Sequence, residues 1–317
     1  MKKPLVSVVI PTHSRVKMLE RLLKSVLASS YRSIEIIVID DVSTDNTYEF
    51  IKNKYKRVKV FRNKTNLFTA GSRNEGFKKS KGEFVFFIDD DNILDKYAIE
   101  KMVDVFLEDN SIGELGLVNY NPNNKRKILW AYTKRNMWTT KTSQPRTLKG
   151  LEGKKTWETV DVPNAFMVRT DIIKKNKIYF KEKYGIMYEE SDYAYRIRNA
   201  GYKVMTVRDA KIYHDIENTL EGNKGKDYMY HFMEDKRRPF VFARNRIIFH
   251  SLYSNKIQLY FILIFWIWFF MTYYLYKIFF YSGIGNFSFS RKLNVSYMYV
   301  KGIFNGLYLV TTKNSIW

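Results

Sequence analysis

The sequence contains no cysteine. This absence excludes a disulfide framework, a thiol nucleophile and a zinc site built from thiolates. Any metal ion would have to be bound by Asp, Glu or His side chains or by oxygen atoms of a substrate. Such ligands favour Mg²⁺ or Mn²⁺, so these are the cofactors to expect.

Acidic residues are scarce relative to basic ones. The 317 residues include 54 Lys and Arg but 32 Asp and Glu, which gives a formal net charge of +22. This charge favours anionic partners such as phosphates, anionic lipid head groups or nucleic acid. No helix-turn-helix, zinc-finger or RNA-recognition signature is present, and much of the aromatic content lies in an apolar tail, so we expect no nucleic-acid partner.

The start of the chain lacks a long apolar run. Residues 5–10 are apolar apart from Ser7, but the run ends at Pro11 and is far too short for a signal peptide. We therefore expect the N-terminal domain to stay on the cytoplasmic face of a membrane. The loop at residues 11–15 also lacks glycine, which argues against a nucleotidyltransferase with a glycine-rich phosphate loop.

Short β-branched runs alternate with helical periodicity over the first half of the chain. The predicted strands are residues 5–10, 34–39, 58–61 and 84–88, and the predicted helices are residues 19–27, 47–54 and 70–79. Such alternation predicts an α/β fold with a mostly parallel sheet and helices on both faces. Because ligands of these sheets lie at the carboxyl ends of the strands, the polar loops starting at Pro11, Asp40 and Asp89 should converge on one cleft.

The second half has a weaker pattern. Residues 119–158 predict a long surface loop region, after which order returns at residues 160–168. A helix is expected over residues 191–200, with Gly201 as its C-terminal cap, followed by a strand over residues 204–207.

Residues 257–276 contain no charged side chain, and about twenty such residues span a bilayer core. We expect a transmembrane or interfacial helix over residues 257–281, the alternative being a buried helix of a soluble protein. A second apolar stretch, residues 295–310, is interrupted by Lys301 and Asn305 and is better interpreted as interfacial. The expected organisation is a catalytic domain at residues 1–250, with a nucleotide-binding half (1–118) and an acceptor half (119–250), followed by a membrane-attachment region at residues 251–317.

Three consecutive carboxylates, Asp89, Asp90 and Asp91, follow the predicted strand at residues 84–88. Asp89 and Asp91 form an Asp-x-Asp pair, which could hold a divalent ion that bridges a diphosphate and neutralises charge on a leaving group. A solvated turn is the alternative for such a pair in isolation. The position at a strand end, beside the other polar loops, favours the metal site.

Four motifs in order resemble the successive signatures of family 2 inverting glycosyltransferases with the GT-A fold, a Rossmann-like α/β fold. They are Val6-Ser7-Val8-Val9-Ile10-Pro11-Thr12, Ile37-Val38-Ile39-Asp40-Asp41, Ser72-Arg73-Asn74-Glu75-Gly76 and Phe87-Ile88-Asp89-Asp90-Asp91-Asn92. The resemblance covers roughly residues 5–250. It implies that the nucleotide-sugar pocket is lined by Pro11, Thr12, Asp40, Asp41 and Asp90. It further implies that Arg73 lies near the nucleotide or diphosphate, that Asp89 faces the ribose, and that Asp91 binds the metal.

The same resemblance extends to the acceptor side, through residues 164–169 and 188–196. An inverting transfer needs one carboxylate to take the proton of the acceptor hydroxyl. The family usually has Asp at the position that is Glu190 here, so either Glu190 or Asp192 is expected to be the base. Acids that only favour a helix N-terminus are the alternative. His214 falls where the family often places a histidine that touches the metal or diphosphate.

The basic segment Arg237, Arg238, Arg244 and Arg246 resembles the one that precedes the membrane part in membrane-bound members, where it would grip a lipid diphosphate or meet anionic head groups. Processive synthases carry a Gln-x-x-Arg-Trp signature and several spans, which are lacking here. The resemblance therefore implies a non-processive enzyme at the cell membrane that transfers one sugar from a nucleotide sugar to a lipid-linked or cell-surface glycan. UDP is the usual nucleotide, with GDP and dTDP open. A catalytically silent sugar-binding relative is the remaining alternative.

Overall fold

The computed structural model describes residues 3–214, 228–235, 237–281 and 287–312. By packing, these residues form two units. The sheet unit lies within Met1–Lys134, Ser143–Gly185 and Glu189–Thr219, and the helical unit lies within Arg135–Thr142, Ile186–Tyr188 and Leu220–Trp317. The helices at residues 228–253 therefore pack with those that follow them. A functional border at residue 250 stays a prediction.

The sheet unit is built on a ten-stranded sheet. Eight strands follow the order β10-β12-β6-β11-β4-β1-β2-β3, and the other two, β5 and β7, pair with β12 and β6. Its strands are β1 (Val6–Thr12), β2 (Ile34–Asp40), β3 (Val58–Arg62), β4 (Phe84–Ile88), β5 (Asn92–Leu94), β6 (Ile112–Asn121), β7 (Asn124–Trp130), β10 (Thr156–Glu158), β11 (Ala165–Arg169) and β12 (Lys203–His214). Strands β3, β2, β1 and β4 are parallel, whereas β11 runs antiparallel between β4 and β6. Two short strands, β8 (Lys134–Arg135) and β9 (Thr142–Ser143), pair separately.

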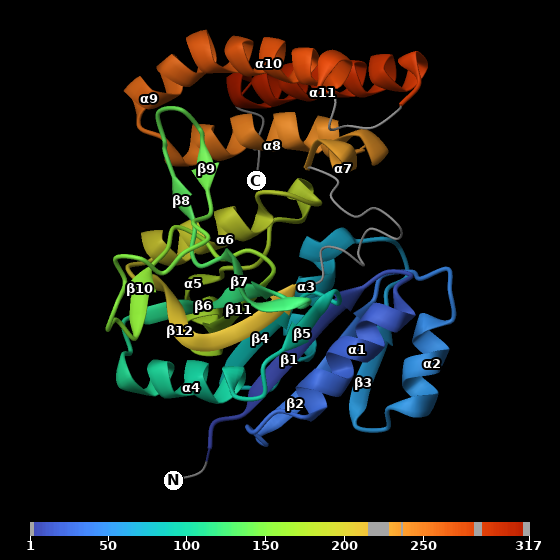
Figure 1. Ribbon diagram of the computed structural model, residues 1–317, viewed down its shortest axis with the longest axis vertical. Helices are drawn as coiled ribbons and strands as arrows, with labels where there is room; N and C mark the ends of the chain where they lie inside the picture. The colour runs from blue at the N-terminus through green and yellow to red at the C-terminus, as the bar shows by residue number, and fades with distance from the viewer. Residues whose placement is uncertain (1–2, 215–227, 236, 282–286, 313–317) are drawn as a thin grey trace. The chain divides into compact units, whose positions relative to one another are not determined.

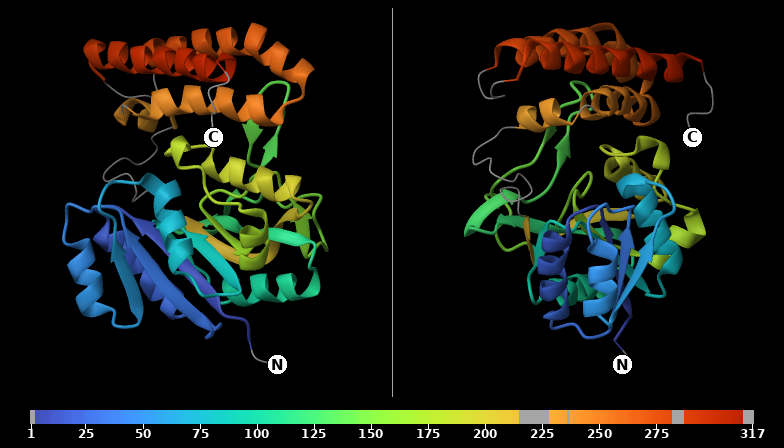
Figure 2. Two further views of the ribbon diagram at one scale, coloured as in Figure 1. Left: turned by 180° about the vertical axis from the view of Figure 1, so that it is seen from behind. Right: turned by 90° about the vertical axis from the view of Figure 1, so that its right-hand side faces the viewer.

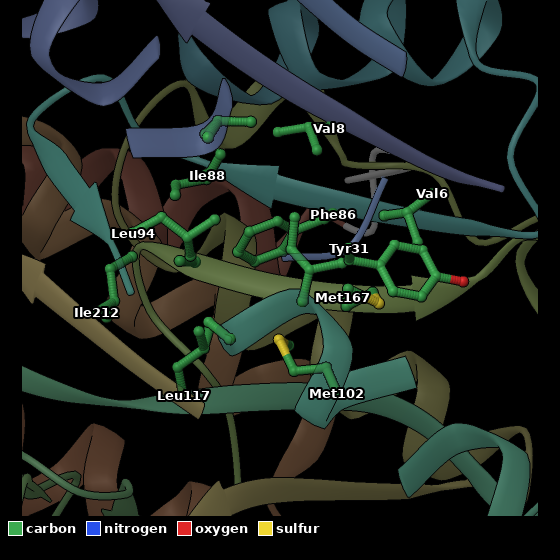
Figure 3. Close-up of a cluster of buried hydrophobic side chains, with 14 of the residues drawn as sticks. Val6, Val8, Tyr31, Phe86, Ile88, Leu94, Met102, Leu117, Met167 and Ile212 are labelled. Atoms are coloured by element: carbon green, nitrogen blue, oxygen red, sulfur yellow. The ribbon is translucent and has the colours of Figure 1, made fainter. Parts of the chain in front are cut away.

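Helices cover both faces of the sheet, as expected for this fold class (Figure 1). They are α1 (Val16–Leu27), α2 (Thr47–Lys54), α3 (Phe68–Lys79), α4 (Ala98–Glu108), α5 (Thr170–Asn176), the 3₁₀ turn η1 (Glu182–Tyr184) and α6 (Glu189–Asn199). Alternate residues of the buried strands point to opposite faces. Val8 and Phe86 accordingly pack with α1 and α4 in the core shown in Figure 3, whereas Val9 and Phe87 pack with α3 and α6 on the other face. The predicted α/β architecture is confirmed.

The C-terminal cap of α6 is also confirmed. Gly201 has a φ of +89°, and its N–H donates to the Arg198 carbonyl while the Tyr202 N–H donates to that of Ile197. This is the Schellman arrangement, which needs a left-handed residue and therefore favours glycine.

The predicted loop at residues 119–158 is wrong in part, because β6 extends to Asn121 and β7 forms a hairpin with it. Strand β7 is polar and exposed over its first four residues, so it carries no hydrophobic alternation. Backbone pairing with β6 holds it in place instead. Val118, Ala131 and Trp157 form a small core of their own beneath this region.

The helical unit contains α7 (Tyr228–Glu234), α8 (Arg237–Tyr253), α9 (Lys256–Phe261), the π-helical turn η2 (Ile262–Trp266), α10 (Ile267–Phe280) and α11 (Phe289–Thr311). Elements α9, η2 and α10 run on as one 25-residue helix, Lys256–Phe280, which is long and apolar enough to cross a membrane. Its bounds agree with the predicted apolar helix. Figure 2 shows α10 and α11 side by side, and α8 packs against α11.

Candidate functional site

The carboxyl ends of β1, β2 and β4 bring three loops to one edge of the sheet. Thr12 and Asp40 are register partners at the ends of β1 and β2. The Thr12 hydroxyl donates to Asp90 Oδ2 at 2.7 Å, which ties the first loop to the carboxylates that follow β4. The convergence expected from the sequence is therefore present for these three loops.

Antiparallel strand β11 adds Asn164 to the same edge. The Asp89 N–H donates to the Asn164 carbonyl at 3.1 Å, and Asn164 itself has a φ of +77°. Its N–H donates to Glu190 Oε1 at 2.9 Å, and its side chain donates to Asn92 at 2.8 Å. Asn164 thus joins the acidic loop to the start of α6.

Arg73 of α3 is the central cation of the site. Its side chain is fully buried, and one guanidinium nitrogen, Nη2, lies 2.7 Å from both Asp89 Oδ1 and Glu190 Oε1. The pKa of Glu190 is raised by burial, although the charge of Arg73 lowers it in part. Burial likewise raises the pKa of the neighbouring Glu189 to about 8. Arg73 therefore connects the acidic loop of the first half with the candidate base of the second.

Glu190 and Asp192 occupy different environments. Asp192 is fully buried, and its carboxylate pairs with Arg196 at 2.7 Å and with Lys181 at 3.7 Å. Glu190 shares Arg73 with Asp89 instead. Of the two candidates for the base, Glu190 is the one that belongs to the Arg73 cluster.

The metal candidates Asp91 and His214 lie together because β5 pairs with β12, in the register Asn92 to His214. His214 Nδ1 is 3.4 Å from Asp91 Oδ1. Burial would raise the pKa of Asp91, but His214 and Arg15 hold it below its usual value, so this carboxylate is ionised at neutral pH. Burial raises the pKa of Asp90 to about 7 despite the charge of Arg15.

Across residues 3–214, 228–235, 237–281 and 287–312, no group of three or more His, Asp or Glu side chains could hold a metal. Asp91 and His214 offer two donors. Mg²⁺ and Mn²⁺ sites often use one or two carboxylates and complete the shell with water and substrate phosphates. This pair therefore fits an ion that is shared with a diphosphate.

Asp40 and Asp41 hold the loop after β2. Asp40 Oδ1 accepts from the Ser43 N–H at 3.1 Å, and Asp41 Oδ1 accepts from the side chain of Asn63 and the N–H of Leu67, both at 2.8 Å. Between Asp41 and Ser43, Val42 has a φ of +60°, which is strained for a β-branched residue. Such strain persists only where the surroundings enforce it, and it clusters at functional sites.

Two further side chains of the site, Arg15 and Trp130, were not predicted from the sequence. Arg15 lies 3.1 Å from Asp90 and 3.7 Å from Asp91, and the ring of Trp130 lies 5.4 Å from that of His214. A basic residue three positions after Thr12 was a usable signal for Arg15. Trp130 gave none, because its place depends on the β6–β7 hairpin.

Several buried donors at this edge lack an acceptor within the described part of the chain. They are Arg73 Nε, Arg73 Nη1 and Trp130 Nε1. A buried N–H without a partner is costly, so such groups call for a ligand or water. The Trp130 ring lies beside that of His214, where its N–H suits an oxygen-rich anion, whereas the Arg73 guanidinium lies over the rings of Phe166 and Phe180.

Glu114 of β6 is a buried acid that the sequence analysis did not identify. It is 1 % exposed, and neither carboxylate oxygen has a hydrogen-bond partner among the described residues. Burial raises its pKa well above the usual value, so the folded chain keeps a proton that the unfolded chain loses near pH 4.5.

Stability should therefore fall as the pH rises above about 4.5, by at most ~1.4 kcal/mol per pH unit for this one proton. Glu114→Gln should remove this loss, so its melting temperature should exceed that of the parent chain by more at pH 8 than at pH 5. Glu158→Gln, which changes an exposed acid, is the control. Equal pH dependence in the parent and Glu114→Gln would contradict the assignment.

Comparison with known proteins gives matches at the levels of family, sequence and fold. The family described as Glycosyl transferase family 2 matches residues 7–176, more than half of the chain. A Campylobacter jejuni GalNAc(5)-diNAcBac-PP-undecaprenol beta-1,3-glucosyltransferase is 36 % identical over 104 residues, which cover 32 % of this chain and 34 % of that protein. The Staphylococcus aureus poly(ribitol-phosphate) beta-N-acetylglucosaminyltransferase TarP is 42 % identical over 126 residues, covering 37 % of this chain and 38 % of the relative.

The chain thus matches well under half the length of these relatives. Among solved structures, GalNAc-T7 with UDP, GalNAc and Mn²⁺ aligns with a TM-score of 0.59 and 20 % identity, covering 87 % of this chain and 57 % of the other. At this identity the likeness concerns the fold alone.

Proposed function

The chain belongs to glycosyl transferase family 2, and from this premise we propose that it transfers one sugar, with inversion, from a nucleoside diphosphate sugar to a hydroxyl of a lipid-linked or cell-surface glycan. The observation that carries the proposal is Arg73, which pairs with Asp89 of the strand-end acids and with Glu190, 2.7 Å from each. A candidate base and the candidate donor site are thus linked by one buried cation.

In this proposal the loops after β1 and β2 hold the nucleotide. Pro11 and Thr12 end β1 and are buried, and Asp40 and Asp41 fix the backbone of the strained loop beside them. Asp89 faces the ribose, and Asp90 positions Arg15. Arg15 and Arg73 supply positive charge to the diphosphate, and Trp130 supplies an unpartnered N–H group.

Glu190 takes the proton of the acceptor hydroxyl as that oxygen attacks the anomeric carbon opposite the leaving diphosphate. The new C–O bond forms as the bond to the diphosphate oxygen breaks, and the proton ends on the Glu190 carboxylate. Asp91 and His214 would hold Mn²⁺ or Mg²⁺, which, when bound, neutralises charge on the leaving group. Asn164 orients Glu190 through its backbone N–H.

We also place the enzyme at the cell membrane, with its catalytic domain on the cytoplasmic face. The apolar helix Lys256–Phe280 supports attachment. The relatives named above, one acting on an undecaprenol-linked glycan and the other on poly(ribitol phosphate), support an acceptor at the cell surface or on a lipid carrier. Confinement to one surface raises the effective concentration of such an acceptor.

The test is a screen of UDP-, GDP- and dTDP-sugars against the purified full chain, with and without Mn²⁺ or Mg²⁺. We expect a metal-dependent rise in melting temperature with one donor, together with slow release of its nucleoside diphosphate. Binding without any turnover, even with acceptor lipid extracts, would favour the catalytically silent relative. Absence of binding under every metal would overturn the proposal.

A further inference from the structure

The apolar helix Lys256–Phe280 is buried on one side only. Ile262, Ile267 and Ile278 are at most 5 % exposed and form a core with Val295 and Tyr299 of α11. A helix that spans a bilayer alone meets lipid around its whole circumference. This helix instead has a protein side and an open side.

Helix α11 cannot follow a spanning helix into the bilayer without cost. It packs along α10 and α8 but carries Arg291, Lys292 and Lys301. Lys292 Nζ donates to the Phe279 carbonyl at 3.0 Å, so this charge is fixed at the end of α10. Each Arg or Lys placed at the centre of a bilayer costs about 2.5–3.5 kcal/mol or more.

Helix α8 packs closely against α11, with the two backbones nearly in contact. A Cβ on Gly302 would overlap the Phe240 carbonyl oxygen, and one on Gly306 would lie 3.1 Å from that of Arg244. Because α8 carries four arginines, a spanning α10 would draw them toward the hydrocarbon as well. The unit as a whole is therefore unsuited to crossing a membrane.

The exposed sides of the helix Lys256–Phe280 and of α11 are apolar. On α11, residues 295, 299, 302, 303 and 306 are buried, and the exposed large apolar residues lie on the opposite side of the helix. The exposed residues of α11 are Phe289, Leu293, Tyr297, Phe304 and Tyr308. Those of the longer helix are Ile257, Tyr260, Phe261, Ile264, Phe265, Trp268, Phe269, Tyr273, Tyr276 and Phe280. A patch of this size on a soluble surface marks a site of interaction.

The positive charge of residues 236–317 indicates that the partner is anionic. Residues 236–317 contain no Asp or Glu and eleven basic residues, namely Lys236, Arg237, Arg238, Arg244, Arg246, Lys256, Lys277, Arg291, Lys292, Lys301 and Lys313. Basic residues near an anionic bilayer contribute about 1 kcal/mol each. Of these, Arg237, Lys256 and Lys301 are exposed. Exposed aromatic residues on helices whose charged residues are all basic are the pattern of helices that lie in the interface.

We propose that α9–α10 and α11 lie in the plane of an anionic membrane surface, with their exposed aromatic stripes among the head groups and upper acyl chains, and that neither helix crosses the bilayer. The unit is then a one-sided anchor. This inference concerns attachment alone and holds whichever sugar is transferred, so its tests need no turnover.

The absence of cysteine in the parent chain makes a direct test possible. Lys256→Cys and Lys277→Cys place single thiols near the two ends of the apolar helix, the first at an exposed position and the second at a half-buried one. In inverted membrane vesicles, a membrane-impermeant maleimide added outside should label both variants to the same extent, within about twofold. Labelling of one end alone until detergent is added would show a span and overturn the proposal.

Vesicle binding tests the stripe itself. Full-length protein should sediment with vesicles of phosphatidylglycerol and phosphatidylcholine, and Phe265→Ser with Trp268→Ser should lower the partition coefficient at least tenfold. The matched control is Tyr97→Ser with Leu107→Ser, which removes two exposed apolar residues from the sheet unit and should change binding less than twofold. If Phe265→Ser with Trp268→Ser instead breaks a dimer in ultracentrifugation without changing vesicle binding, the stripe contacts a second copy and the membrane proposal fails.

Discussion

Replacing Asp91 by alanine should lower the rate of sugar transfer by roughly a thousandfold or more. Asp91 is ionised beside His214, and the proposed metal neutralises charge on the leaving diphosphate, an effect of several kcal/mol. Each 1.36 kcal/mol corresponds to about a tenfold change in rate. The measurement is release of the nucleoside diphosphate by purified protein with the donor identified in the screen.

Asp104→Asn is the matched control, because it removes an exposed carboxylate of α4 on the same unit. It should retain full activity. A melting temperature for Asp91→Ala close to that of the parent chain would show that the fold survives. If folded Asp91→Ala keeps more than a tenth of the activity, the metal assignment is wrong.

Glu190→Gln should lower kcat about 10²–10⁴-fold while donor binding remains, because a general base contributes a factor of this size. Asp192→Asn should behave differently. Asp192 is fully buried against Arg196, so its loss should reduce stability by about 3–5 kcal/mol and leave kcat of the folded protein within tenfold. Glu190→Asp, which restores the residue usual in the family, should keep part of the activity.

The pH dependence of kcat/KM distinguishes the catalytic base from an acid that only stabilises the fold. A base acts when ionised, so kcat/KM should fall with a slope of one as the pH drops through the pKa of Glu190, which burial raises. The inflection should lie above the usual glutamate value of about 4.3. Glu190→Gln should lose this limb. If Asp192→Asn loses it instead, Asp192 is the base.

Local signals were sufficient for the elements that need no distant partner. The bounds of α2 and β4 match the predicted residues 47–54 and 84–88, because apolar and helical periodicity ends there in polar loops. Strand β7 was not predictable in this way, because its exposed polar residues show no apolar pattern and its backbone pairing with β6 stabilises it instead.

The same division holds at the site. The acids of the strand ends follow from their position after apolar runs. The choice between Glu190 and Asp192 does not. The pair of Asp192 with Arg196 is local to α6, but the pair of Glu190 with Arg73 joins two helices that are distant in the sequence. The place of Glu190 in the site arises from packing between α3, α6 and the loop before β11, which lie far apart in the sequence.

Gly302 and Gly306 allow α8 and α11 to touch through their backbones. Contacts of this kind depend on shape complementarity and dispersion. They therefore persist in lipid and detergent, where the hydrophobic effect no longer drives helices together. The helical unit should therefore arrive at the membrane already assembled. Binding would then carry no penalty for ordering the chain, and extraction with mild detergent should release the protein with α8, α10 and α11 still packed together.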